Sequence, residues 1–418
     1  MKNRCLDICM LVGNSVTQDP RVRKEAETLA SFGYSLSVLG FKLTPQDTEQ
    51  EVFAPGFKVI RINISVIKPW IKKLIENLAS EKPRKVKKIA INFCELFLEL
   101  YQAFRLVSKA ITINAAVYHA HDLDTLPAAY LASLRFRGKL VYDSHELYTE
   151  QREDFPRLLK LLLQWIEGRL IKKTVGVITV NQSIAGELAK RYAVPVPLVL
   201  RNFMKKTFME EAATANLIQP EEIRVLYHGG YLKGRGLEEL IESIIYWDRN
   251  INLYLRGFGP IEDYLRRQVS GLSLENRVVF LEPVSMERII AEAAFADIGI
   301  IPYKPTCLNN FYSMPNKLFE YMMAGLAVAA SDLPEISRLN EEVGFGLLFD
   351  PDSPESIAGS INNLVRDRDF LQTCRNNVRA WSGAAGNWET ESGKLLNFYR
   401  DIFNSNQQIL CRGEINEK

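Results

Sequence analysis

The stretch DIGIIPYKPTCLNNFYSMPNKLFEYMMAGLAVAASDLPE, residues 297–335, contains the order of elements that decides the fold class. It opens with the apolar run 298–301, which is typical of a strand buried in a parallel sheet. A loop rich in Pro, Asn and Ser follows over 302–316, and residues 317–324 then have the pattern of a helix. A second apolar run, 326–330, has the composition of another buried strand. This order predicts a βαβ crossover in an α/β fold, with the loop ending at a helix N-terminus.

The start of the predicted helix is suited to an anion, because free backbone N–H groups and the positive end of the helix dipole meet there. In an open α/β sheet, ligands also bind at this edge. Lys317 adds a cation, and Glu320 offers two acceptor oxygens that suit the vicinal hydroxyls of a ribose. The alternatives are that Lys317 is solvated and that Glu320 is only a charge near the helix start.

The motif PNKLFEYMMAG, followed by ASDLPE, resembles the nucleotide-sugar site of glycosyltransferase family 4, a retaining family with the GT-B fold. That family usually has a Glu-x7-Glu pattern, in which the second Glu binds the ribose and the first lies near the transferred sugar. Glu320 matches the second position, whereas Tyr312 stands at the first, as in a similar subset of the family with S-x-PNK before FEY. The resemblance implies a donor site that includes Pro315, Asn316, Lys317, Leu318 and Glu320.

A glycine-rich segment, HGGYLKGRG at residues 228–236, lies between a predicted strand and a predicted helix. Glycines let backbone N–H groups approach a diphosphate, and Arg235 offers a planar guanidinium to its oxygens. The family usually has Arg and Lys in this loop, where the present chain has Gly230 and Arg235. The resemblance therefore implies that Arg235 is the principal cation for the diphosphate and Lys317 the second. Other expected donor contacts are Gly229, Gly230 and Gly257.

Two further predicted strands end in polar residues, HAHD at 119–122 and DSHE at 143–146. Three histidines at adjoining strand ends could bind a metal ion with Asp122 or Glu146, or they could be core residues. The matching stretches of family 4 line the cleft, and that family needs no tightly bound metal. The resemblance thus implies that His121 acts in catalysis near the transferred sugar, and that Asp122, His145 and Glu146 position the acceptor.

The first predicted strand, 8–12, is followed by Gly13 and then by a helix that begins near Asp19. The G-x-G-x-x-G fingerprint of a dinucleotide site is absent from the sequence. The resemblance to family 4 implies instead that Gly13 lets the acceptor approach the backbone.

Residues 68–88 contain eight Lys or Arg against two Glu, and they interleave with a Trp and with aliphatic residues. Basic residues beside an apolar face are what an anionic lipid surface attracts. We therefore hypothesise that this segment docks on a membrane. The alternative is a solvated loop and helix face.

Composition bounds the remaining possibilities. A chain of 418 residues is expected to form two domains, and 47% apolar residues are ordinary for a globular protein. The net charge of +2 gives no sign of a nucleic-acid partner. The six cysteines are scattered, which favours reduced thiols and a cytoplasmic location. We recognise no signal peptide, and no apolar stretch is long enough to span a bilayer.

These observations predict an α/β protein with GT-B architecture, in which two Rossmann-like parallel-sheet domains face a central cleft. The acceptor domain is expected at 1–204 with a crossing helix at 388–404, a linker at 205–221, and the donor domain at 222–387. The predicted function is retaining transfer of a sugar from a nucleotide-sugar to a saccharide or lipid-linked acceptor, without a cofactor or tightly bound metal. The alternatives are a non-catalytic partner subunit and a nucleotide-sugar epimerase of the same fold.

Overall fold

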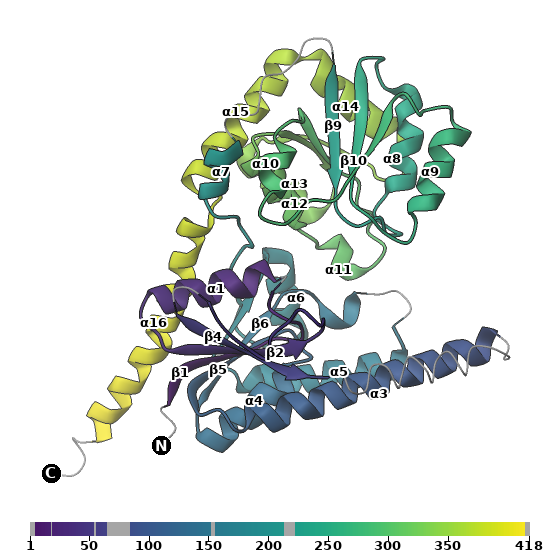
Figure 1. Ribbon diagram of the computed structural model, residues 1–418. Coiled ribbons are helices and arrows are strands. Elements are labelled where there is room, and N and C mark those ends of the chain that lie inside the picture. Colours follow the sequence, from purple (N-terminus) through teal and green to yellow (C-terminus); the bar gives the residue numbers. More distant parts are fainter. Residues whose placement is uncertain are drawn as a thin grey trace.

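The structure, a computed structural model, describes residues 5–17, 19–53, 56–64, 84–151, 155–212 and 222–413. The chain forms two α/β domains, each built on its own sheet (Figure 1). This arrangement confirms the predicted fold class. Apolar strands alternate with amphipathic helices along the sequence, and such a pattern produces parallel sheets covered on both faces.

The first sheet has the strand order β3-β4-β2-β1-β5-β6-β7-β8 and is parallel except for the edge pair β3–β4. Its strands are β1 (Leu6–Leu11), β2 (Leu36–Lys42), β3 (Gln50–Phe53), β4 (Phe57–Asn63), β5 (Ala115–His121), β6 (Lys139–Ser144), β7 (Gly176–Thr179) and β8 (Leu198–Val199). The helices are α1 (Pro20–Ser31), α3 (Arg84–Ala110), α4 (Leu126–Phe136), α5 (Arg157–Leu170) and α6 (Gln182–Tyr192), with 3-10 turns η1 (Tyr148–Glu150) and η2 (Ile171–Lys173).

The second sheet is parallel throughout, with the order β11-β10-β9-β12-β13-β14. Its strands are β9 (Ile223–His228), β10 (Ile251–Arg256), β11 (Val278–Leu281), β12 (Ile298–Ile301), β13 (Ala327–Ser331) and β14 (Gly346–Phe349). The helices are α7 (Thr207–Ala212), α8 (Leu237–Ser243), α9 (Glu262–Gly271), α10 (Ile289–Ala293), α11 (Leu308–Phe311), α12 (Asn316–Met323), α13 (Pro334–Val343), α14 (Pro354–Arg366), α15 (Arg368–Ala384) and α16 (Trp388–Gly413), with the 3-10 turn η3 (Ile244–Tyr246).

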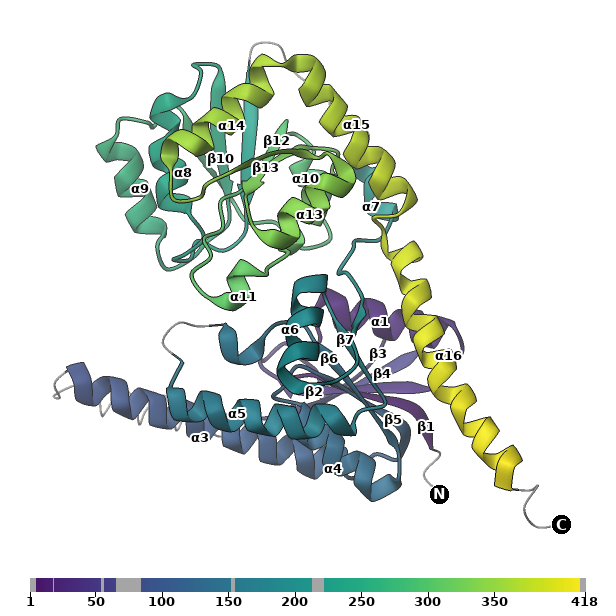
Figure 2. The same cartoon turned by 180° about the vertical axis from the view of Figure 1, so that it is seen from behind.

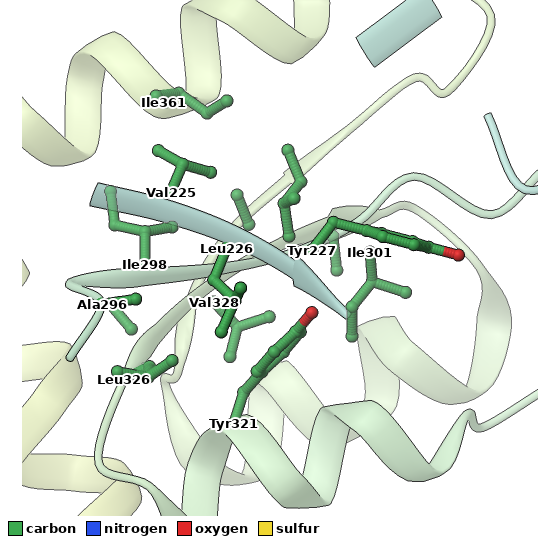
Figure 3. Close-up of a cluster of buried hydrophobic side chains, with 14 of the residues drawn as sticks. Val225, Leu226, Tyr227, Ala296, Ile298, Ile301, Tyr321, Leu326, Val328 and Ile361 are labelled. Carbon is green, nitrogen blue, oxygen red and sulfur yellow. The ribbon is translucent and has the colours of Figure 1, made fainter. Parts of the chain in front are cut away.

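The core of the second domain explains why its strands are apolar on both faces. Figure 3 shows Val225 of β9 on the side of Ile361 from α14, and Leu226 on the side of Tyr321 from α12. A Cβ atom on Gly299 of β12 would lie only 2.3 Å from the ring of Tyr321. Glycine at this position therefore allows α12 to pack directly on the sheet.

The two faces of the first sheet are covered by different parts of the chain. Ile8 of β1 packs with α1 and with Tyr399 of α16, so the C-terminal helix lies against the first domain (Figures 1 and 2). Trp388 fixes the start of that contact by donating from Nε1 to Oγ1 of Thr28 at 2.9 Å. Cys9 points to the opposite face, where α3 and α4 cover the sheet.

The order in which strands are added reverses beside the first strand of each sheet. β1 lies between β2 and β5, and β9 lies between β10 and β12. Open α/β sheets bind ligands at such switch points, outside the carboxyl ends of the strands. His121 ends β5 and His228 ends β9, so polar residues of both domains are placed at these edges.

Some elements differ from the expectation. The segment 302–316 contains the short helix α11, and the expected linker begins with α7, which packs on α10 and α12. The sequence pattern did not indicate β3 or β4. Across the helices that the structure describes, none combines the length and hydropathy needed to cross a bilayer. The hypothesis of membrane docking through 68–88 falls mostly outside the described residues, and none of the side chains in that range is described.

Candidate functional site

A cleft of about 700 Å³ lies between the two domains. Its first-domain wall comes from the start of α1, the segment after β6 and the start of α6. Its second-domain wall comes from the end of β9, the glycine-rich segment and the region before and within α12. The predicted site residues that line it are His145, Glu146, Gly229, Arg235, Pro315, Asn316, Lys317 and Glu320.

Lys317 supplies a buried cation to the second-domain wall. The residue is 6% exposed, and its Nζ has no hydrogen-bond partner among the described residues. The ammonium lies 3.8 Å from the ring centre of Tyr227 and 4.9 Å from that of Tyr303. Burial, together with nearby Arg235, holds the pKa of Lys317 well below its usual range, although Glu320 opposes this shift. A buried amine without a partner is costly, so this position is suited to an anion.

Arg235 lies close to Lys317 and completes a cationic corner of the cleft. Its guanidinium stacks 4.1 Å from the ring centre of Tyr303, the same ring that Lys317 approaches. Tyr303 therefore fixes the direction of both side chains. Two adjacent cations at the end of a glycine-rich loop are arranged for a group with more than one negative oxygen, such as a diphosphate.

Glu320 is held by a histidine that was not predicted as a site residue. Nε2 of His228 lies 2.7 Å from Oε2 of Glu320, and the His228 backbone N–H donates to the Tyr321 hydroxyl at 2.9 Å. Burial lowers the pKa of His228, although Glu320 raises it, so the imidazole is neutral near pH 7. Nδ1 of His228 has no hydrogen-bond partner among the described residues, so the proton is assigned to Nε2, which donates to Glu320. The Oε1 atom of Glu320 is then available for a ligand hydroxyl.

The glycines of this wall permit close approach of backbone segments. A Cβ atom on Gly257 would lie 2.0 Å from the carbonyl oxygen of Gly229, and both residues have positive φ angles of 156° and 127°. A Cβ atom on Gly229 would lie 3.0 Å from Nζ of Lys317. Side chains at these positions would displace the loop or the cation. Gly230 accepts a hydrogen bond from the hydroxyl of Tyr227 at 2.9 Å, which fixes the loop further.

The helix α11 joins the two walls. Asn309 accepts from the backbone N–H of Leu147 at 2.9 Å and donates to Oε2 of Glu146 at 3.1 Å. The side-chain amide of Asn181 donates to the carbonyl oxygen of Tyr312 at 2.8 Å. Tyr312, which occupies the position of the missing first Glu, also packs against the core of the first domain. These contacts hold the domains together beside the cleft.

On the first-domain wall, His145 is a cation held by two carboxylates. Its Nε2 lies 3.2 Å from Asp143, its Nδ1 lies 3.4 Å from Asp122, and its backbone N–H donates to Asp122 at 2.9 Å. Although burial disfavours the charged form, Asp122 and Asp143 raise the pKa of His145 to about 10. The imidazolium lines the cleft with 17% of its side chain exposed.

This charge state predicts a pH dependence of stability. The native pKa of His145 lies above the value of about 6.5 for an unfolded histidine, so protonated His145 stabilises the fold fully below about pH 6.5. That stabilisation decreases as the pH rises and is lost at about pH 10. We expect His145→Gln to lower the unfolding free energy by on the order of a few kcal/mol near pH 6 but little near pH 10. Urea unfolding of both proteins across this pH range measures the difference between their unfolding free energies. If this difference did not change with pH, the raised pKa of His145 would be contradicted.

Behind His145 lies a buried network centred on Arg21 and Asp143. Arg21 donates to both carboxylate oxygens of Asp143, at 3.0 and 2.9 Å, and its Nε lies 3.1 Å from Glu25. Ligand atoms of Glu25, His119, His121 and Asp143 lie within 4.8 Å of one another, and all four residues are buried. This set could hold a metal ion by composition, but Arg21 already pairs with Asp143, and burial together with Asp143 raises the pKa of the Glu25 carboxyl to about 8.

Among the described residues, several predicted site residues do not line the cleft. His121 is 1% exposed, with its Nδ1 3.1 Å from Nε2 of His145, and Leu318 is part of the second-domain core. The remaining ones are Gly13, Asp122, Gly230 and Gly257. Their roles toward substrate stay predictions, and the contacts show that Asp122 and His121 support His145.

Comparisons with known proteins bear on this site and fold. The family model described as Glycosyltransferase Family 4 matches residues 22–200, and the one described as Glycosyl transferases group 1 matches residues 222–367. The chain is 23% identical to an uncharacterized glycosyltransferase of Methanocaldococcus jannaschii over 75% of this chain and 78% of that protein. It is 25% identical to a GDP-mannose-dependent phosphatidylinositol monomannoside mannosyltransferase of Mycobacterium tuberculosis, over 40% of this chain and 44% of that enzyme, less than half its length.

Solved structures share the arrangement of both domains. Sucrose-phosphate synthase from Thermosynechococcus elongatus superimposes with a TM-score of 0.72 at 18% identity, covering 96% of this chain and all of that one. Anabaena HepE, solved in complex with UDP, superimposes with a TM-score of 0.67 at 16% identity, covering 95% of this chain and all of that one. With the two family models together matching most of the sequence, the chain belongs to glycosyltransferase family 4 and is a glycosyltransferase of the GT-B fold.

Proposed function

We propose that this glycosyltransferase transfers a sugar from a nucleoside-diphosphate sugar, with retention, to a saccharide or lipid-linked acceptor. The observation that carries the proposal is the buried Lys317 ammonium, which has no hydrogen-bond partner among the described residues and lies beside Arg235 at the cleft. A departing nucleoside diphosphate develops negative charge, and preorganised cations in a partly dry site stabilise that charge.

The neighbouring groups support the same orientation of the donor. Glu320, held by His228, would accept hydrogen bonds from the ribose hydroxyls on one side of the cationic corner. The sugar would then extend toward the first-domain wall, where His145 and Glu146 line the cleft. A relative named for GDP-mannose and a structural neighbour solved with UDP support a nucleotide donor without selecting the base.

The first-domain wall offers groups for the acceptor and the transferred sugar. Glu146 has one oxygen engaged by Asn309, which leaves the other for an acceptor hydroxyl. We propose that the imidazolium of His145, supported by His121, contacts the transferred sugar or the departing phosphate. With the pair Arg21–Asp143 already neutralised, we propose that transfer needs no tightly bound metal.

Thermal unfolding with a panel of UDP-, GDP-, ADP- and dTDP-sugars tests this proposal. One nucleotide is expected to stabilise the protein by about 2.7 kcal/mol at 100 times its dissociation constant. Glu320→Ala and Arg235→Ala should lose this response, because they remove the ribose and diphosphate contacts. Lys233→Ala, which changes an exposed residue of the same glycine-rich segment, is the control. If none of these nucleotide-sugars stabilised the wild-type protein, donor binding would be contradicted.

A further inference from the structure

The outer face of α5 exposes an unusual number of large apolar side chains. Leu158 is 84% exposed, Leu161 55%, Leu162 52% and Trp165 56%. Their spacing of three and four residues places them in one stripe along the helix. Single exposed leucines need no explanation, but a contiguous apolar stripe marks a surface that contacts something apolar.

Basic residues follow this apolar stripe at the end of α5 and in η2. The guanidinium of Arg169 stacks 4.3 Å from the ring centre of Trp165, and Lys172 and Lys173 follow in η2 with exposed side chains. The one acidic residue in the sequence 157–173 is Glu167, which is 3% exposed and accepts hydrogen bonds from Tyr142 and Tyr192. Segment 157–173 therefore presents apolar and cationic groups outward.

The neighbouring helix α4, which packs on α5, extends this surface. Leu131 is 43% exposed and Leu134 59%, and the exposed Arg135 and Arg137 follow them. Figures 1 and 2 show both helices on the side of the first sheet turned away from the second domain. The α4–α5 face is defined here as Leu131, Leu134, Arg135, Arg137, Arg157, Leu158, Leu161, Leu162, Trp165, Arg169, Lys172 and Lys173.

The charges on this face indicate whether it binds a second copy of the chain or an anionic bilayer. A second copy of the chain docked through the same face by a two-fold axis would bring the basic residues of both copies together, which is unfavourable. An anionic bilayer surface satisfies both features, because leucines and tryptophan enter the interfacial region while Lys and Arg contact lipid headgroups. We propose that the α4–α5 face docks this glycosyltransferase on an anionic lipid bilayer.

The surface lies within reach of the cleft. Gln151 lines the cleft, and the chain from Gln151 to Leu158 spans at most roughly 25 Å when fully extended. A bilayer on the α4–α5 face would thus hold lipid-linked molecules at the domain that carries the first-domain wall, although on the opposite side of its sheet. This consequence rests on the proposed function, and it favours a lipid-linked acceptor over a free saccharide.

Co-sedimentation of the full chain with vesicles tests the docking directly, with no donor present. We expect binding to vesicles of equal parts phosphatidylcholine and phosphatidylglycerol, weak binding to phosphatidylcholine alone, and release by salt. Leu158→Ser/Leu161→Ser and, separately, Lys172→Ser/Lys173→Ser should each lower the partition coefficient by at least about tenfold. The matched control is Val52→Ser/Ile245→Ser, which replaces apolar residues that are 72% and 54% exposed elsewhere.

Wild-type protein that stays in solution with anionic vesicles would overturn the proposal. So would loss of binding in the control alone, or a dimer in sedimentation equilibrium that Leu158→Ser/Leu161→Ser dissociates while vesicles are not bound. Thermal unfolding of each variant with the responding nucleotide-sugar checks folding and donor binding separately. Failure of docking is thereby distinguished from failure of the proposed transferase function.

Discussion

Lys317→Met is expected to lower kcat/KM for the donor by about 10²–10³-fold, because it removes a preorganised cation aimed at the leaving diphosphate. The same substitution should not destabilise the protein without ligand. The amino group is buried and has no hydrogen-bond partner among the described residues, so exchange for a thioether removes the cost of burying a polar group. Methionine also keeps a favourable contact with the ring of Tyr227. We expect the unfolding free energy to stay level or rise by about 1 kcal/mol.

Opposite effects on activity and stability make this prediction specific. Donor turnover and urea unfolding of the same preparations measure both quantities. Lys233→Met is the matched control, since Lys233 is exposed in the same glycine-rich segment, and it should leave both nearly unchanged. If Lys317→Met destabilised the free protein while turnover stayed normal, Lys317 would be a structural cation and the donor site would lie elsewhere.

Arg21→Met should destabilise the first domain by about 3–5 kcal/mol, because the buried carboxylate of Asp143 loses both guanidinium hydrogen bonds and keeps only the His145 imidazolium as a cationic partner. Arg21 is 3% exposed and Asp143 is fully buried, so water cannot replace the lost contacts. Arg21 also donates to the carbonyl oxygen of Leu200 at 2.8 Å, which would lose its partner. Urea unfolding followed by circular dichroism and by fluorescence measures the change.

Arg23→Met on the same helix is the control for this effect. Arg23 is about one-third exposed and lies 3.9 Å from Glu27, which is typical of a surface pair worth about 0.2–1 kcal/mol. Equal losses from the two substitutions would show that the Arg21–Asp143 pair contributes no more than a surface contact. A large loss from Arg21→Met alone would establish that this pair supports the first-domain wall behind His145.

The donor side of the cleft could be predicted from a short stretch of sequence. Apolar runs flanking a Pro- and Asn-rich loop specify a βαβ unit, so Lys317 and Glu320 were predicted at the carboxyl edge of the sheet. The family comparison and the GT-B architecture confirm the predicted family and fold. The alternative that Lys317 is solvated is wrong, because the two aromatic rings that bury it come from separate parts of the chain.

Other features depend on contacts between distant segments, which local patterns do not contain. His228 is 92 positions before Glu320, and only the pairing of β9 beside β12 brings them together. Alternation predicts that His119 and His121 share a face, and their rings are stacked at 4.3 Å. It does not predict that Tyr399 of α16 covers His119, with its hydroxyl 2.7 Å from Nδ1 of that histidine.

For α5, the local pattern suggests more burial than the structure shows. Its sequence, RLLKLLLQWIEGRL, has the composition of a helix packed in a core. In the structure, half of that apolar pattern faces outward, because α5 packs on the first-domain core through its other side, where Leu163, Glu167 and Leu170 lie. Amphipathicity specifies which residues share a face, whereas tertiary packing decides whether a second apolar face is covered.

The most direct test of the donor site is a calorimetric titration with the nucleoside diphosphate whose base responds in the thermal panel. We expect the ribonucleotide to bind wild-type protein about tenfold more tightly than its 2′,3′-dideoxy analogue, because Glu320 accepts hydrogen bonds from the ribose. Glu320→Ala should remove this preference, and Lys317→Met should weaken both nucleotides. Equal affinities of the two nucleotides for wild-type protein, or unchanged binding to Lys317→Met, would contradict a donor site formed by these residues.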